Sequence, residues 1–144
     1  MAGRARAAAA LAALAGVPLS LGLAFAGQPQ QKSIHDGVFT PEQVAAGKEV
    51  YATVCSECHA TDTFGPDYMA GWTGASVAEL FQQIQATMPY ESPGTLEDKQ
   101  YANVLVYLFN INGVAAGDQE MPSDVAELRE INIAGPFKWN GEER

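Results

Sequence analysis

The chain has 144 residues, of which 47% are hydrophobic, and its 17 acidic and 8 basic residues give a formal net charge of −9 at pH 7. This length is typical of one domain, and the apolar content is sufficient for a packed core, which argues against disorder. Because an acidic surface repels phosphate groups, the charge argues against binding to nucleic acids and anionic membranes. It maintains solubility and permits docking to a basic protein.

The first 26 residues have the pattern of a secretory signal peptide. Arg4 and Arg6 precede a long uncharged apolar run, and residues 24–26 (AFA) offer a cleavage site of small residues. Pro18 and the many alanines favour cleavage over the alternative of an uncleaved membrane anchor. We therefore expect an exported, periplasmic protein that keeps no stable membrane span.

Cleavage would leave a mature chain with a flexible, extended lead-in at residues 27–39 and a single domain at residues 40–144. Because residues 1–26 contain two arginines and no acid, their removal changes the net charge from −9 to −11.

A first helix is predicted to begin at Thr40, which serves as the N-cap. Pro41 suits the first turn, and Gln43 completes a capping box. Small and apolar residues then recur at helical spacing: Val44, Gly47, Val50, Tyr51 and Val54. The helix therefore leads directly into the sequence Cys55-Ser56-Glu57-Cys58-His59.

This segment contains both cysteines of the chain, Cys55 and Cys58, directly followed by His59. Zinc would need four ligands, and only a distant His35 is available besides these three. A thioredoxin-like redox site should lie among alternating strands and helices, which the sequence lacks. Cys-x-x-Cys-His is the attachment motif of c-type haem, and this interpretation uses both cysteines of an exported protein.

The spacing suits the chemistry of this attachment. Each thiol adds to one vinyl group of the haem, and two intervening residues let one turn of backbone present both sulfurs. The adjacent His59 supplies the proximal ligand to the iron. We expect one covalently attached haem c, with residues 60–75 forming a loop over its edge and Phe64, Tyr68 and Trp72 as apolar cover.

Two further helices are predicted. Ser76 and Glu79 form a second capping box, and Pro89 ends the helix that it begins. Thr95 is expected to cap the next helix, and residues 112–113 (NG) to end it. Their apolar faces contain Val77, Leu80, Phe81, Ile84 and Met88, and then Leu96, Val104, Leu105, Leu108 and Ile111. A short helix is expected after Ser123, followed by an arm whose Phe137 and Trp139 either pack back on the domain or form an interface.

The sixth ligand of the iron decides the function, because a methionine sulfur suits an electron carrier and an open site suits gas binding or peroxide chemistry. Met69 is close to His59 in sequence, and Met121 is far along the chain. Met88 ends the second helix just before a proline-containing turn. Spacing alone leaves Met88 as either an iron ligand or a core residue.

These residues together resemble the class I c-type cytochromes with His–Met ligation. Gly47 and Tyr51 look like the pair with which that family's first helix crosses its last, and Val104 and Tyr107 look like their counterparts. The segment from Glu79 to Asp124 is similar to the cytochromes that accompany periplasmic quinoprotein alcohol dehydrogenases, in its order of Thr-Met-Pro, Pro-Gly, a Tyr-containing helix and Asn-Gly.

The resemblance implies an all-α cytochrome c fold, with three core helices and a short C-terminal helix packed around one haem. It makes Cys55 and Cys58 the thioether anchors, His59 the proximal ligand and Met88 the distal ligand. The chain departs from the family in its short loop after the motif, where only Pro66 is available to help orient His59.

The function implied is electron transfer without enzymatic activity. The donor would be an exported redox enzyme such as a quinoprotein dehydrogenase, and the acceptor a downstream oxidase or cytochrome. The alternatives are a permanently bound haem subunit of a dehydrogenase complex, and a haem enzyme or gas sensor with an open distal site.

Overall fold

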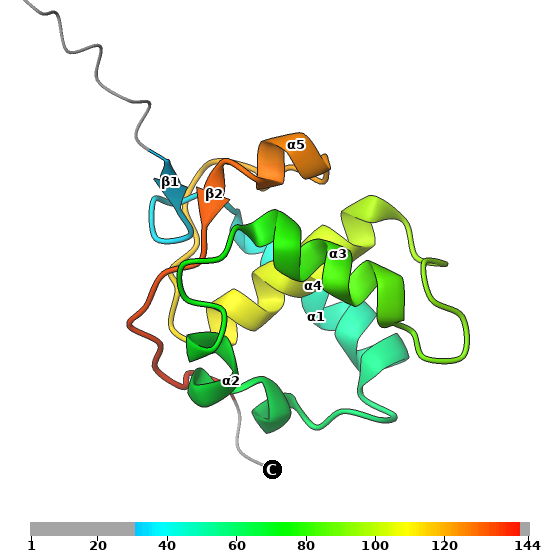
Figure 1. Cartoon of the computed structure of the whole chain (residues 1–144). Coiled ribbons are helices and arrows are strands. Elements are labelled where there is room, and N and C mark those ends of the chain that lie inside the picture. The colour runs from blue at the N-terminus through cyan, green and yellow to red at the C-terminus, as the bar shows by residue number, and fades with distance from the viewer. Residues whose placement is uncertain (1–30, 142–144) are drawn as a thin grey trace, which may run out of the picture.

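Helices form most of the regular structure in the computed structural model, which describes residues 31–141 (Figure 1). The predicted signal peptide lies outside these residues. The α-helices are α1 (Pro41–Val50), α2 (Pro66–Ala70), α3 (Val77–Thr87), α4 (Asp98–Ile111) and α5 (Val125–Leu128). A π-helical turn, η1 (Tyr51–Cys55), extends α1; η2 (Thr61–Phe64) is a 3₁₀ turn; and β1 (Lys32–Ser33) and β2 (Ile131–Asn132) form a two-stranded sheet. The prediction of an all-α domain is confirmed.

Both capping boxes that the sequence predicted are present. At the start of α1, the Thr40 hydroxyl accepts the Gln43 N–H, and the Gln43 side-chain oxygen accepts the Thr40 N–H, each at 3.3 Å. At the start of α3, the Glu79 carboxylate accepts the Ser76 N–H at 2.7 Å. These bonds satisfy N–H groups that have no partner within the helix, so local sequence fixes where α1 and α3 begin.

Helix α4 begins later than predicted. Its N-cap is Glu97, which forms a capping box with Gln100, whose side-chain oxygen accepts the Glu97 N–H at 2.9 Å. The predicted cap, Thr95, instead donates its hydroxyl to the Ser92 carbonyl at 2.9 Å and so closes the preceding turn. The end of the helix is as predicted, because Gly113 adopts a φ of 86°, which favours glycine.

The central contact of the fold is the crossing of α1 and α4 at Gly47. A methyl group at Gly47 would overlap the Asn103 carbonyl oxygen and lie 3.0 Å from the Tyr107 Cβ. One turn further on, the Tyr51 and Tyr107 rings pack with their centroids 5.4 Å apart. The helix crossing expected from the resemblance is therefore confirmed, and the absence of a side chain at Gly47 permits it.

A buried side chain links the start of α1 to a distant segment. The Gln43 amide oxygen accepts the Met121 N–H at 2.8 Å, and its amide nitrogen donates to the Met121 carbonyl at 3.0 Å and to the Asn103 side chain at 3.3 Å. The Met121 side chain itself lies in the main core. Gln43 therefore holds this core residue against the start of α1.

The lead-in predicted to be flexible is packed where the structure describes it. Residues 32–33 pair in parallel with residues 131–132, and Ile34, Val38 and Phe39 are buried. The prediction was wrong for these residues because a pairing across about one hundred residues leaves no local signal. Their burial makes the segment part of the main core.

We predict that Gly47→Ala destabilises the folded protein by about 2 kcal/mol. The added methyl group forces α1 away from the Asn103 backbone, and this cost exceeds the gain in helix propensity. Denaturant unfolding measures the difference. Ala45→Ser, on the exposed face of α1, is the control and should stay within about 0.5 kcal/mol of the parent; a Gly47→Ala variant equally stable would contradict the crossing.

Candidate functional site

The two cysteines and the following histidine share one turn of backbone at the end of α1. The helix widens into η1 and ends at Cys55, whose carbonyl accepts the N–H groups of Cys58 at 3.2 Å and His59 at 2.9 Å. The predicted approach of a helix to the motif is confirmed. The turn places two thiols and an imidazole within five residues.

The thiols differ in their surroundings. Both are free, and Cys55 is half-buried whereas Cys58 is exposed. Burial raises the pKa of the Cys55 thiol above its usual value. At neutral pH Cys55 is therefore a neutral thiol that packs as an apolar group against its neighbours.

Two aromatic side chains contact His59, one through its ring and one through its hydroxyl. The Tyr51 hydroxyl donates to the His59 carbonyl at 2.9 Å, which ties the motif back to η1. The His59 ring packs against the Phe64 ring, with centroids 5.1 Å apart, and Phe64 in turn makes edge contacts with Tyr51 and Tyr68. These contacts limit how far His59 can move relative to α1.

The segment after the motif is more regular than the loop predicted for residues 60–75. It contains η2 and α2, and Pro66 occupies the first position of α2, where a proline needs no N–H partner. Phe64, Tyr68 and Trp72 are half-buried. Because the segment between the motif and α3 is short, it folds into the helical turns η2 and α2, which bury Met69.

Met88 is the C-cap residue of α3, and its backbone is held by three bonds. Its N–H donates to the Ile84 carbonyl at 2.8 Å, and its carbonyl accepts the Tyr101 hydroxyl at 2.7 Å and the Gly94 N–H at 3.3 Å. Its side chain is half-buried. The ends of α1 and α3 that lead to the motif and to Met88 point to the same side of the molecule (Figure 1).

The rival ligands lie elsewhere. Met69 is 0% exposed and Met121 2% exposed, and both belong to the main core. The exposed His35 has its Nε2 atom 2.8 Å from the Ala134 carbonyl, on the surface beside the C-terminal arm. Among the methionines within residues 31–141, Met88 is the one whose side chain is not fully buried.

A second apolar cluster lies beside the motif. Its buried members are Tyr51, Val104, Tyr107, Leu108 and Ile111, and it is bordered by Val44, Val50, Cys55, Phe64 and Trp139. Cys55 is thus part of an apolar wall built by α1, η1 and α4. Two thiols and an imidazole in one turn, with Cys55 against such a wall, fit a flat apolar group that carries a metal ion, as a haem does.

Sequence reasoning did not identify two hydroxyls that hold this site. Tyr51 was assigned only to the helix crossing, and Tyr101 was given no role in the site, yet each donates to the carbonyl of a candidate iron ligand. The spacing of Tyr51 before His59 is a local signal of such a bond. The bond of Tyr101 to Met88 depends on how α4 packs, so the sequence gives no sign of it.

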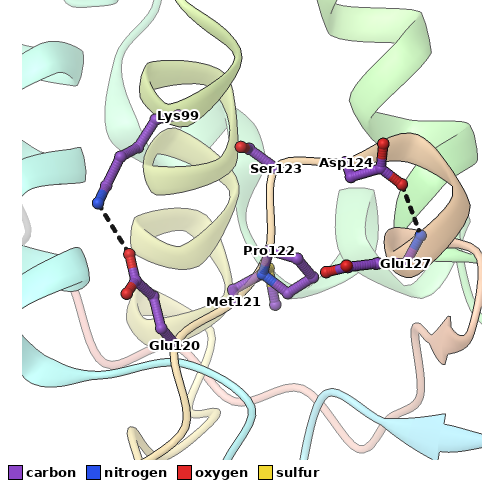
Figure 2. A pocket seen from close by; sticks show the side chains of 7 residues that line it. All are labelled: Lys99, Glu120, Met121, Pro122, Ser123, Asp124 and Glu127. Atoms are coloured by element: carbon purple, nitrogen blue, oxygen red, sulfur yellow. Dashed lines mark hydrogen bonds and ion pairs between the residues drawn. The ribbon is translucent and has the colours of Figure 1, made fainter.

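A surface hollow between α4 and the segment before α5 is lined in part by Met121 and by none of Cys55, Cys58, His59 and Met88 (Figure 2). Lys99 and Glu120 form an exposed ion pair across it at 2.8 Å, and the Asp124 carboxylate caps α5. An exposed pair of this kind contributes little to stability.

Within residues 31–141, no three His, Cys, Asp or Glu residues gather closely enough to hold a metal ion. No helix in that range has the length and apolar character needed to cross a membrane.

Comparisons with known proteins agree with the geometry. Residues 42–108 match the family model described as "Cytochrome C oxidase, cbb3-type, subunit III". Neither the curated proteins nor the solved structures gave a match. The matched range runs from α1 into α4 and includes the motif and Met88. The structure is therefore consistent with an all-α cytochrome c fold, and residues 42–108 are similar to a c-type cytochrome domain.

Proposed function

We propose that the chain is an exported c-type cytochrome with one covalently bound haem, which carries single electrons between protein partners. The observation that carries this proposal is the turn of Cys55, Cys58 and His59 at the end of α1, within a domain that matches a c-type cytochrome. Haem bound there supplies an iron ion that gains and loses one electron.

Each candidate residue has a distinct role in this proposal. Cys55 and Cys58 hold the haem through thioether bonds, His59 is the proximal ligand, and Met88 is the distal ligand. The partial exposure of Met88 and the full burial of Met69 and Met121 support this assignment. Two protein ligands leave no position for a substrate, so the site favours a carrier over an enzyme.

The partners proposed are an exported redox enzyme as donor, such as a quinoprotein dehydrogenase, and a downstream oxidase or cytochrome as acceptor. The predicted signal peptide supports a periplasmic location. Residues 55–72 and 88–98, which carry the candidate ligands, contain six exposed acids and no Lys or Arg. This charge favours a partner with a basic docking surface.

A second candidate is a permanently bound haem subunit of a larger redox complex. It is favoured by the description of the matching family, which names a subunit of an oxidase. Gentle isolation of the chain from its native source distinguishes the two. A free carrier is recovered alone, whereas a subunit is recovered with stoichiometric partner chains.

Met88→Ala should convert the protein from a carrier to a gas-binding haem protein. The parent protein should show the weak far-red band of a sulfur–iron bond in the ferric state, and its ferrous state should resist carbon monoxide. The variant should lose the band and bind carbon monoxide rapidly. Met69→Leu and Met121→Leu are controls that keep both properties, and rapid carbon monoxide binding by the parent would refute the carrier proposal.

Tyr101→Phe should loosen Met88 without removing it. The lost hydroxyl held the Met88 carbonyl, and a bond of this kind contributes about 1 kcal/mol, so the rate of carbon monoxide binding should rise roughly fivefold. Stopped-flow mixing of the ferrous protein measures this rate. Tyr90 is an exposed tyrosine in the turn that follows Met88, and Tyr90→Phe is the matched control. An equal effect of both substitutions would argue against the proposed bond.

The acidic surface should make docking dependent on salt. We expect the rate of reduction by a basic donor protein to fall steeply as the salt concentration rises, because salt screens charges on exposed surfaces. Glu91→Gln, in the turn after Met88, should lower the rate at low salt and reduce the dependence on salt. A reduction rate independent of salt would contradict docking through this surface.

A further inference from the structure

Asn112 is a polar side chain that is 0% exposed at the end of α4. Its amide nitrogen donates to the Phe64 carbonyl at 2.7 Å and to the Leu108 carbonyl at 2.8 Å. The bond to Leu108 lies within the helix, whereas the bond to Phe64 reaches a turn 48 residues away. Burial of an amide is costly unless its bonds are made, and the Oδ1 atom of Asn112 has no hydrogen-bond partner among the described residues. The two bonds of the amide nitrogen are therefore the polar contacts of this side chain, and the bond to Phe64 links η2 to the end of α4.

The backbone around Asn112 holds a third segment, the C-terminal arm. The Asn112 carbonyl accepts the Lys138 N–H at 2.9 Å, and the Ile111 carbonyl accepts the Asn140 N–H at 2.6 Å. A Cβ at Gly113 would lie 2.8 Å from the Lys138 carbonyl oxygen, so the arm lies directly on the end of the helix.

Between these two bonds, Trp139 packs against the second apolar cluster. A Cβ at Gly65 would lie 3.9 Å from the Trp139 ring. Figure 1 shows the arm running from β2 towards α2. The arm, which the sequence left as either packed or an interface, therefore covers the turn that follows the motif.

We propose that Asn112 is a positioning residue for His59, acting through Phe64. It joins the end of α4, the η2 turn and the C-terminal arm at one point, and Phe64 packs its ring on the His59 imidazole at 5.1 Å. The effect of Asn112 on an iron ligand rests on the proposed function. The contacts at Asn112 that join α4, η2 and the C-terminal arm do not depend on it. The arm is then a structural part of the haem site.

Asn110 provides a matched control. It lies two residues earlier in α4, and its amide nitrogen donates to the Val114 carbonyl at 3.2 Å, which closes the same helix end without touching η2. If Asn112 served only to end the helix, substitution at either position would have the same effect.

The test uses Asn112→Ser and Asn110→Ser in the haem-loaded, full-length protein. A serine hydroxyl can still bond to the carbonyl four residues earlier, Leu108, but is too short to reach Phe64. Amide hydrogen exchange at Thr63 and Gly65, whose N–H groups close η2, should accelerate at least tenfold in Asn112→Ser. The NMR signals of the His59 ring should shift in the same variant, while exchange in α3 stays unchanged.

Asn110→Ser should leave both readouts at their parent values. Unchanged exchange at Thr63 and Gly65 in Asn112→Ser, or an equal change in both variants, overturns the proposal. If Asn112→Ser does not fold, Trp139→Leu replaces it and should accelerate exchange at Gly65; no acceleration overturns the proposal. Carbon monoxide binding by the parent tests the proposed function separately. If the protein is not an electron carrier, amide hydrogen exchange still tests the junction at Asn112.

Discussion

The close approach of α1 and α4 at Gly47 is the contact on which the rest of the structure depends. Because no side chain stands between Gly47 and the Asn103 carbonyl, the two helices come near enough for Tyr51 and Tyr107 to pack together. Tyr51 begins the turn that ends at Cys55, so the crossing sets where the motif lies relative to α4. The same helices supply the buried residues of the apolar cluster beside the cysteines.

Each of the two candidate iron ligands accepts a hydrogen bond from a tyrosine hydroxyl at its backbone carbonyl. Tyr51 donates to the carbonyl of His59, and Tyr101 donates to the carbonyl of Met88. Each bond fixes the position of a backbone carbonyl and places no restraint on the side chain of the candidate ligand. Both tyrosines lie on the two helices that cross. Tyr51 is in η1, which extends α1, and Tyr101 is in α4. The packing of two helices thereby controls both sides of the proposed haem.

Local rules in the sequence predict much of this arrangement. The capping boxes at Thr40 and Ser76, the stop at Gly113 and the motif at Cys55 each depend on a few adjacent residues, and the structure has each of them where it was expected. Long-range contacts account for what was missed. The burial of Ile34 and the junction at Asn112 require partners far away in the chain, which no local pattern reveals. Helix α4 starts later than predicted because the capping box of Glu97 and Gln100 forms in place of a cap at Thr95.

The proposed function depends on covalent attachment of one haem through Cys55 and Cys58. Mass spectrometry of the protein, produced in cells able to attach haem c and extracted with acidified acetone, tests it most directly. We expect the protein to keep the mass of one haem and a peptide containing both cysteines to carry it. Loss of the haem on extraction, or a Cys55–Cys58 disulfide in the isolated peptide, would contradict it.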